Sequence, residues 1–245
     1  MASLKYVGGN SATGTGATYS VSLTGLTGGL SSTAAANDIV IVYFGWTADG
    51  NITPTLAVQT ASYNYVAATQ RANDTRDTVG RMAYKIMGGT PDTTCVTDGP
   101  NNAAYGGGAV VQVWRNVDTA SPTTGTGSMT SALNTNHADP AAITPAVNNA
   151  VVLVGMTGGG VSTATGTKTG PTNYTTYQVS VKADGAGADS YIALNARIIA
   201  GGAGNAQDAG AYSGGDTTTS DGYTVGTLAI APGGGVFTAG SYYKV

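Results

Sequence analysis

The sequence contains no glutamate: all 13 acidic residues are aspartate, and only 9% of the 245 residues are charged. Glu, Lys, Leu and Arg fill the exposed faces of most helices, whereas Thr and Val suit the pleated surface of a sheet. A chain with abundant Thr and only 10 Lys and Arg residues therefore has little material for amphipathic helices. We expect an all-β protein.

Other absences exclude whole classes of protein. The single cysteine, Cys95, excludes an internal disulfide framework, and we interpret it as an inert, half-buried thiol. The net charge of −3 comes without a Lys/Arg cluster, so no nucleic-acid partner is expected. The longest apolar run is far too short to span a membrane, and residues 1–6 lack the apolar segment of a secretory signal. We expect neither a membrane partner nor secretion.

Residues that catalyse reactions or bind metals are scarce. His137, the only histidine, lies in the polar stretch NTNHADPAA, and neither it nor Cys95 has partners at zinc spacing. Every carboxylate is Asp and most follow turn patterns, so no pair is singled out for glycoside hydrolysis. Residues 184–189 and 201–210 have the Gly and Asp content of degenerate calcium loops, and a calcium ligand is left open. We predict no enzymatic activity, no catalytic residue, no metal site and no cofactor.

Short β-branched and aromatic runs recur between Gly, Asn and Thr turns. In 19–23, Tyr19, Val21 and Leu23 alternate with serines, which is typical of a strand with one wet face. The run 39–44 is apolar throughout, as expected of a central strand covered on both sides. The predicted strands are 19–23, 39–44, 63–69, 82–87, 109–114, 151–156, 174–181, 191–199 and 223–230.

The two halves of the chain resemble each other. NDIVIV at 37–42 is echoed by NNAVVLV at 148–154, YNYVAATQ by YTTYQVSV, and YKIMGGTPD by ARIIAGGAGNAQD. Lys85 and Arg197 align at a separation of 112 positions (197 − 85). The repeated order predicts two β-units, about 37–122 and 148–232, that pack face to face as one antiparallel, jelly-roll-like sandwich of roughly eight to ten strands.

The stretch WRNVDTASP is either an active-site loop or a structural corner at which a strand turns. It follows the apolar run 109–113, and AIAPGGG at 229–235 is its counterpart in the second unit. We interpret Trp114, Arg115, Asp118 and Pro122 as a structural corner, in which the Asp118 carboxylate accepts backbone N–H groups and Pro122 ends the strand pairing. Arg115 is a candidate for a local ion pair with Asp118.

Both ends of the chain carry aromatic or apolar residues outside the predicted sandwich, which we place at 19–232. The C-terminal arm 233–245 contains VFTAGSYYKV, although an exposed terminal tail is normally polar. The tail either folds back on its own sandwich or docks on a neighbouring subunit, and we favour the neighbour. The candidate subunit contacts are Leu4 and Tyr6 in the N-terminal arm 1–18, and Phe237, Tyr242 and Tyr243 in the C-terminal arm.

The motifs ANDIVIV, YNYVAATQ, YKIMGGTPDTT and above all WRNVDTASP resemble the Gly/Thr-rich β-sandwich proteins of tailed-bacteriophage virions. Those proteins have a strand that ends in a hydrophobic-x-(R/S)-G-V-D-T-x-x-P corner, and they share a jelly-roll or concanavalin-like shape with carbohydrate-binding modules. The resemblance runs from Asn37 to Pro232. It departs at Asn116, where the pattern has Gly, although Asn tolerates a positive φ better than most residues.

The resemblance implies a virion protein without catalysis, assembled in the host cytoplasm. The leading hypothesis is a capsid decoration or cement protein that contacts other copies of itself and the major capsid protein or another virion protein. One alternative is a tail-fibre or receptor-binding module that recognises host surface glycans, since 14 tyrosines against two Phe and two Trp suit adaptable recognition. A glycoside-active enzyme on a lectin-like sandwich is the third.

Overall fold

The described residues of the computed structural model are 3–49, 52–72, 76–132, 138–160, 169–174, 177–183, 188–213 and 222–234. They form thirteen strands and no helix, which confirms the all-β sandwich expected from the composition. The strands are β1 (Lys5–Gly14), β2 (Thr18–Ser22), β3 (Ile39–Asp49), β4 (Asn64–Tyr65), β5 (Gln70–Ala72), β6 (Arg76–Ile86), β7 (Thr94–Asp98), β8 (Gly107–Arg115), β9 (Ser128–Ala132), β10 (Val151–Gly160), β11 (Val179–Ala183), β12 (Asp189–Ile198) and β13 (Tyr223–Ile230).

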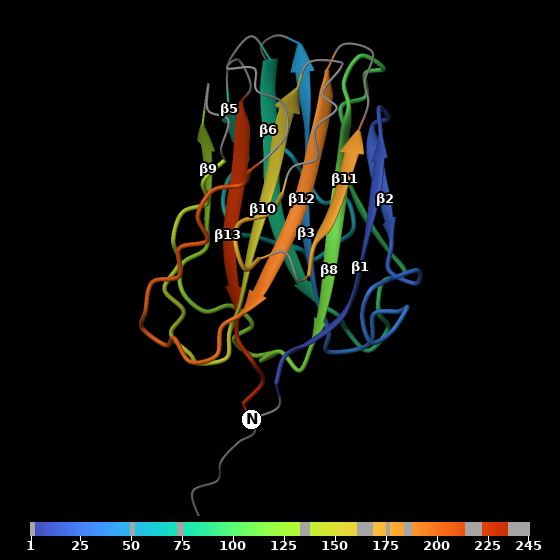
Figure 1. Cartoon of the computed structure of the whole chain (residues 1–245). Helices are drawn as coiled ribbons and strands as arrows, with labels where there is room; N and C mark the ends of the chain where they lie inside the picture. The colour runs from blue at the N-terminus through green and yellow to red at the C-terminus, as the bar shows by residue number, and fades with distance from the viewer. Residues whose placement is uncertain are drawn as a thin grey trace, which may run out of the picture.

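Two antiparallel sheets form the sandwich (Figure 1). The first has the order β1-β8-β3-β6-β4, with β5 also paired to β6, and the second has the order β11-β12-β10-β13-β9. The sheets pack with β3 over β10, β8 over β12 and β6 over β13. A third, two-stranded sheet of β2 and β7 covers the outer face of the first sheet, where its side chains join the same hydrophobic cluster as those of β3.

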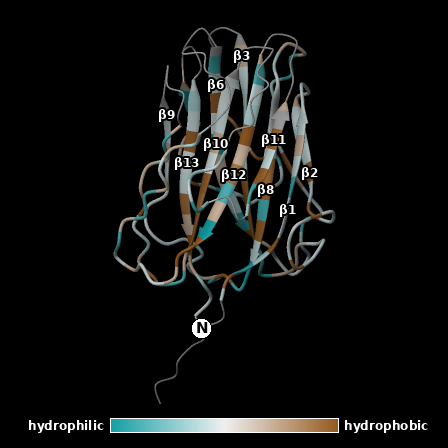
Figure 2. Cartoon of the chain, in the orientation of Figure 1, coloured by the Kyte–Doolittle hydropathy of each residue, from teal (hydrophilic) through white to brown (hydrophobic). Residues whose placement is uncertain are grey.

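The central strands are buried on both faces. In β3, Ile39, Ile41 and Tyr43 lie in the core between the sheets, while Val40 and Val42 point to a second core beneath β2 and β7. A third core covers the outer face of the second sheet beneath loop residues. Hydrophobic residues accordingly recur along the strands of both sheets (Figure 2). This arrangement explains why the run 39–44 is apolar at every position, as the sequence predicts.

The two sheets repeat one topology. In each, one long strand lies in the middle (β3 or β10), flanked by two long strands that follow it in the chain (β6 and β8, or β12 and β13). The pairing register repeats as well: Val40 lies opposite Lys85 in the first sheet, and Val152 lies opposite Arg197 in the second. Both residues of the second pair are 112 positions beyond those of the first (152 − 40 and 197 − 85). The two sheets thus share their strand order and this pairing register.

Five regions differ from the sequence-based expectation. Lys5–Gly14, placed in an N-terminal arm, is the edge strand β1, because it pairs with β8 along its whole length in spite of its Gly and Ser content. Of the run 63–69, only Asn64–Tyr65 pairs with β6, and in 174–181 the strand begins at Val179. The short strands β7 and β9, rich in Thr and Ser, were not predicted either. Residues 235–245 of the C-terminal arm lie outside the described residues.

Candidate functional site

The stretch that follows β8 is a backbone corner. Trp114 is fully buried, and Asn116 adopts a φ of 63°, so the departure from Gly at this position leaves a left-handed residue in place. The Asp118 carboxylate accepts hydrogen bonds from the N–H groups of Ala120 and Ser121 at 3.0 and 3.1 Å. These are the contacts of a turn residue, and they occupy one carboxylate oxygen with the protein's own backbone.

The corner pairs with its counterpart in the second half. Val117 and Pro232 form an antiparallel bridge, the Asp118 N–H donates to the Ala231 carbonyl at 3.0 Å, and the Gly233 N–H donates to the Asn116 carbonyl. The Ala231 N–H in turn donates to the Pro122 carbonyl at 3.0 Å. The ends of the two equivalent strands β8 and β13 therefore lie side by side, as expected where a pseudo-twofold axis passes between two repeats.

Arg115 does not pair with Asp118. Its Nε and one terminal nitrogen each donate to the Asp38 carboxylate at 2.8 Å, a bidentate ion pair. Asp38 is buried and also accepts the Ala35 N–H at 2.8 Å, and this pairing raises the pKa of Arg115 above its usual value. The expected local pair is wrong because β3 and β8 are neighbours: Ile39 lies opposite Trp114, so positions 38 and 115 meet.

The N-terminal residues proposed as subunit contacts pack within their own chain. Leu4 is buried, and the Tyr6 ring lies 5.3 Å from Trp114 and 5.0 Å from Tyr177, measured between ring centroids. Burial raises the pKa of Tyr6 to about 12. This aromatic cluster closes the side of the sandwich where the edge strands β1 and β11 face each other. Phe237, Tyr242 and Tyr243 lie outside the described residues.

A groove, here called the side groove, lies beside this cluster. It consists of two adjoining hollows of about 390 and 420 Å³ that share Tyr6, Gly28 and Tyr177. One end is polar, with Asn10 and Gln178 in its lining. The other end is more apolar and includes Leu30, whose side chain is 61% exposed. Leu30, Leu4 and the rings of Tyr6 and Tyr177 together give this end of the groove its apolar lining.

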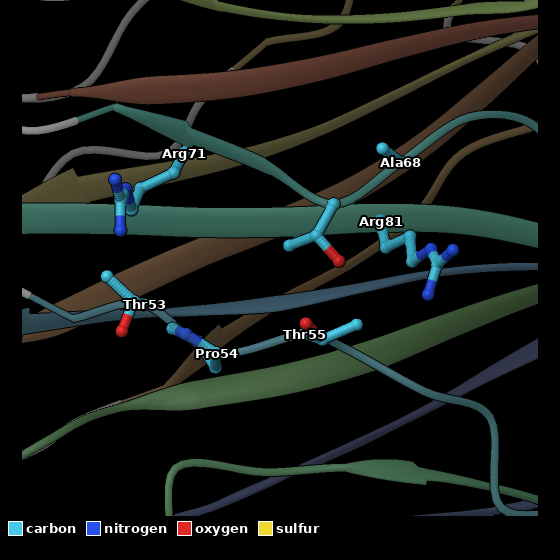
Figure 3. A pocket seen from close by; sticks show the side chains of 7 residues that line it. Thr53, Pro54, Thr55, Ala68, Arg71 and Arg81 are labelled. Carbon is cyan, nitrogen blue, oxygen red and sulfur yellow. The ribbon is translucent and has the colours of Figure 1, made fainter.

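A second hollow, here called the arginine trough, lies on the outer face of the first sheet beside β5 and β6 (Figure 3). It has a volume of about 400 Å³, within the range of small-ligand sites. Figure 3 shows Arg71 and Arg81 extending toward opposite ends of the trough. The residues that line it are Thr53, Pro54, Thr55, Ala68, Thr69, Arg71 and Arg81.

Backbone carbonyls hold both arginines. Arg71 donates to the Ile52 carbonyl at 2.8 Å, and Arg81 donates to the carbonyls of Ala67, at 3.3 Å, and Leu56. The Arg81 guanidinium also lies over the Tyr65 ring, 3.5 Å from its centroid. Burial lowers the pKa of Arg81 from its usual value, so the surroundings disfavour its charge.

An aromatic hollow adjoins the trough across Thr53 and Pro54. It has a volume of about 430 Å³, and its lining includes Trp46, Pro100 and Tyr105. Sequence reasoning did not single out this hollow or either arginine of the trough. The two arginines come from different strands, and the threonines around them are too frequent in this chain to form a recognisable motif.

The sequence candidates for chemistry contribute little to these hollows. His137 lies outside the described residues. Cys95 is fully buried rather than half-buried, and burial raises the pKa of its thiol to about 12, which disfavours the reactive thiolate. Within the described ranges, no three His, Cys, Asp or Glu side chains are grouped closely enough to hold a metal ion, and no helix is long and apolar enough to span a membrane.

Of the 14 tyrosines, several are core residues rather than surface ones. Tyr43 and Tyr212 are fully buried and donate to the carbonyls of Thr224 and Val154 at 2.8 and 2.9 Å. The buried hydroxyls thus tie the sheets and loops together. Tyr6, Tyr65, Tyr105 and Tyr177 border or adjoin the hollows described above.

No family model, no curated protein and no solved structure matches this chain. The functional argument therefore rests on the residues and geometry of the sandwich itself.

Proposed function

We propose that this chain is a structural protein of a tailed-phage virion, and that it decorates the capsid through contacts with other copies and with the major capsid protein or another virion protein. The corner at Trp114–Asp118 carries the proposal. Its sequence resembles the corner of virion β-sandwiches, and Asn116 adopts the positive φ that a glycine would supply there. The sandwich also has three hydrophobic cores and few charged residues, which suits a unit on a particle surface.

The side groove is the surface that fits subunit contact. Its apolar end exposes Leu30, and the chain leaves β13 close to it: the Gly233 N–H bonds to Asn116, whose side-chain amide donates to the Ser3 carbonyl at 2.9 Å. Residues 235–245 follow directly and contain Phe237, Tyr242 and Tyr243. In this proposal, these residues from one copy occupy the side groove of the next.

Truncation after Gly233 tests this contact. We expect the truncated protein to fold, as measured by a cooperative thermal melting transition, and to sediment as a monomer. Leu30→Ser should have the same effect from the other side of the contact, while Val147→Ser, at another exposed apolar residue, is the matched control. A truncated protein that assembles normally contradicts the contact. Imaging of purified particles tests the location: many copies over the capsid lattice support decoration, and a few copies at the tail tip exclude it.

A second candidate function is a tail-fibre or receptor-binding module that recognises host surface glycans. The arginine trough and the adjoining aromatic hollow favour it, because glycan sites combine aromatic surfaces with a few polar groups. A glycan array probed with the purified chain tests this function directly. Binding to no glycan contradicts it and leaves the decoration proposal standing.

A further inference from the structure

The two guanidinium groups of the arginine trough keep hydrogen-bond donors free. A guanidinium has five N–H donors. In the described structure Arg71 uses one of them, toward Ile52, and Arg81 uses two, toward Ala67 and Leu56. The ion pairs among the described residues are Lys85–Asp92 and Arg115–Asp38, so neither arginine of the trough has a carboxylate within ion-pair distance there.

This placement is unusual for a chain with a net charge of −3 and only 10 Lys and Arg residues. Two of those cations line one hollow of about 400 Å³, half-buried and bound to neutral carbonyls. Desolvation of a guanidinium is costly, and an anionic group that enters the trough would offset that cost with charge-assisted hydrogen bonds. The trough therefore favours a negatively charged ligand.

The shape of the trough requires a ligand whose negatively charged groups lie apart from each other. Arg71 and Arg81 extend to opposite ends, with threonine side chains between them (Figure 3). A single small anion would reach one guanidinium and leave the other unpaired. A chain with a carboxylate at each end of a hydroxyl-bearing stretch would pair with both, because Thr53 and Thr55 are exposed and can exchange hydrogen bonds with ligand hydroxyls.

We infer that the arginine trough binds a carboxylated oligosaccharide, with acidic groups on two different sugar residues paired to Arg71 and Arg81. The adjoining hollow beside Trp46 and Tyr105 continues the surface for further, neutral sugar residues. An acidic peptide fits less well, since it offers carboxylates but few hydroxyls for the threonines. The inference rests on the second proposed function, glycan recognition, and names its ligand class.

Calorimetric titration of the full chain with three probes of equal length tests the inference. The probes are tetragalacturonate, its methyl ester, which keeps the sugar but removes each charge, and tetra-aspartate. We expect tetragalacturonate to bind about a hundredfold more tightly than its methyl ester, because the ester lacks both charge-assisted contacts. It should also bind more tightly than tetra-aspartate, which offers carboxylates but no hydroxyls to the threonines. Equal binding of acid and ester overturns the charged ligand class but leaves glycan recognition intact. Binding of neither sugar overturns both, and preferential binding of tetra-aspartate overturns the saccharide assignment.

Three variants locate the site. Arg71→Ala should weaken tetragalacturonate binding about tenfold and leave the ester unaffected. The matched control, Arg197→Ala, removes the same charge from an exposed position in the second sheet and should change nothing. Thr55→Val replaces an exposed hydroxyl without loss of volume, so it should weaken acid and ester alike even if the arginine variant proves unstable. Tetragalacturonate binding that is unchanged in Arg71→Ala or Thr55→Val places the ligand elsewhere.

Discussion

The central strands of the two halves, β3 and β10, face each other with residues of unlike size. Tyr43, Gly45 and Thr47 of β3 correspond, 112 positions later, to Gly155, Thr157 and Gly159 of β10. Each of these glycines packs against its own counterpart: a Cβ on Gly155 would lie 2.2 Å from the Tyr43 ring, one on Gly45 2.5 Å from the Thr157 hydroxyl, and one on Gly159 2.8 Å from a Thr47 methyl group.

This comparison shows what a duplicated chain gains over a symmetric pair of identical units. On a true twofold axis each residue meets a copy of itself, so Tyr would meet Tyr and Gly would meet Gly. Within one chain the two positions can differ, and a large residue can fill the space that a glycine leaves. The three pairs here alternate in direction, which lets the sheets approach closely along the axis.

A second pair of equivalent positions differs in charge. Asn37 and Asn149 both precede a central strand with positive φ, 67° and 59°, and the Asp38 and Ala150 carbonyls accept equivalent bonds from Met87 and Ile199 at 2.8 Å. The two halves differ in the side chains at the positions that follow these asparagines. The first half has the Asp38–Arg115 ion pair, and the second has alanines at both corresponding positions, since Val151 lies opposite Ile230.

The largest effect on stability is expected when the glycine that faces Tyr43 is replaced by a larger residue. Gly155→Ala places a methyl group against the Tyr43 ring in a core with no room, so we expect it to lower the free energy of unfolding by about 3 kcal/mol. Chemical denaturation measures this. Gly88→Ala, where a Cβ meets nothing within 4 Å, is the control and should be nearly neutral. The loss should shrink when Tyr43 is also changed to Ala; an equal loss in that background would disprove the pairing.

Asp38→Ala should have the next largest effect, about 2 kcal/mol, because it leaves the Ala35 N–H and the Arg115 guanidinium without their acceptor. The Arg115 side chain is 36% exposed, which moderates the loss. Asp38→Ala combined with Arg115→Ala recreates the arrangement of the second half and should cost less than Asp38→Ala alone. A double variant less stable than the single one would show that the two halves are not interchangeable here.

A smaller effect is expected from the ionisation of Tyr6. Burial in the folded chain raises the pKa of its hydroxyl from the ordinary value of 10 to about 12. The folded state then holds the phenolic proton more tightly, so this contribution is complete below pH 10 and is lost as the pH rises from 10 toward 12. Tyr6→Phe should flatten the fall in stability in that range by on the order of 1 kcal/mol at pH 11. Urea titrations at pH 8 and pH 11 measure it; identical pH dependence in both proteins would contradict the assignment.

The smallest effect is expected at the corner. Asp118 accepts two N–H groups in an exposed turn, and Gly234 occupies the corresponding place after β13. Asp118→Ala should therefore lower the free energy of unfolding by at most about 1 kcal/mol and leave glycan or particle binding unchanged. Thermal melting and a binding assay together test it. Loss of binding at an unchanged melting temperature would identify the corner as a site.

Much of the fold could be predicted because its causes are local. Alternation of apolar and polar residues at 19–23, the apolar run 39–44 and the lack of helix-forming residues depend only on neighbours along the chain. The sequence also aligns Lys85 with Arg197. The pairing register of the two sheets agrees with this alignment, since Val40 lies opposite Lys85 and Val152 lies opposite Arg197. Strand β1 was missed because its Gly and Ser residues give no strand pattern; pairing with β8 makes it a strand.

The sequence by itself determined the all-β class, the alternating strand 19–23 and the role of Asp118 as a turn residue, because composition, periodicity and turn chemistry act over a few residues. Only the tertiary structure decided the partner of Arg115, since Asp38 is 77 positions away and meets it through the register of β3 on β8. The same holds for the arginine trough. Arg71 and Arg81 lie on neighbouring strands, and the threonines that complete the trough approach them only when the chain folds over the outer face of the sheet.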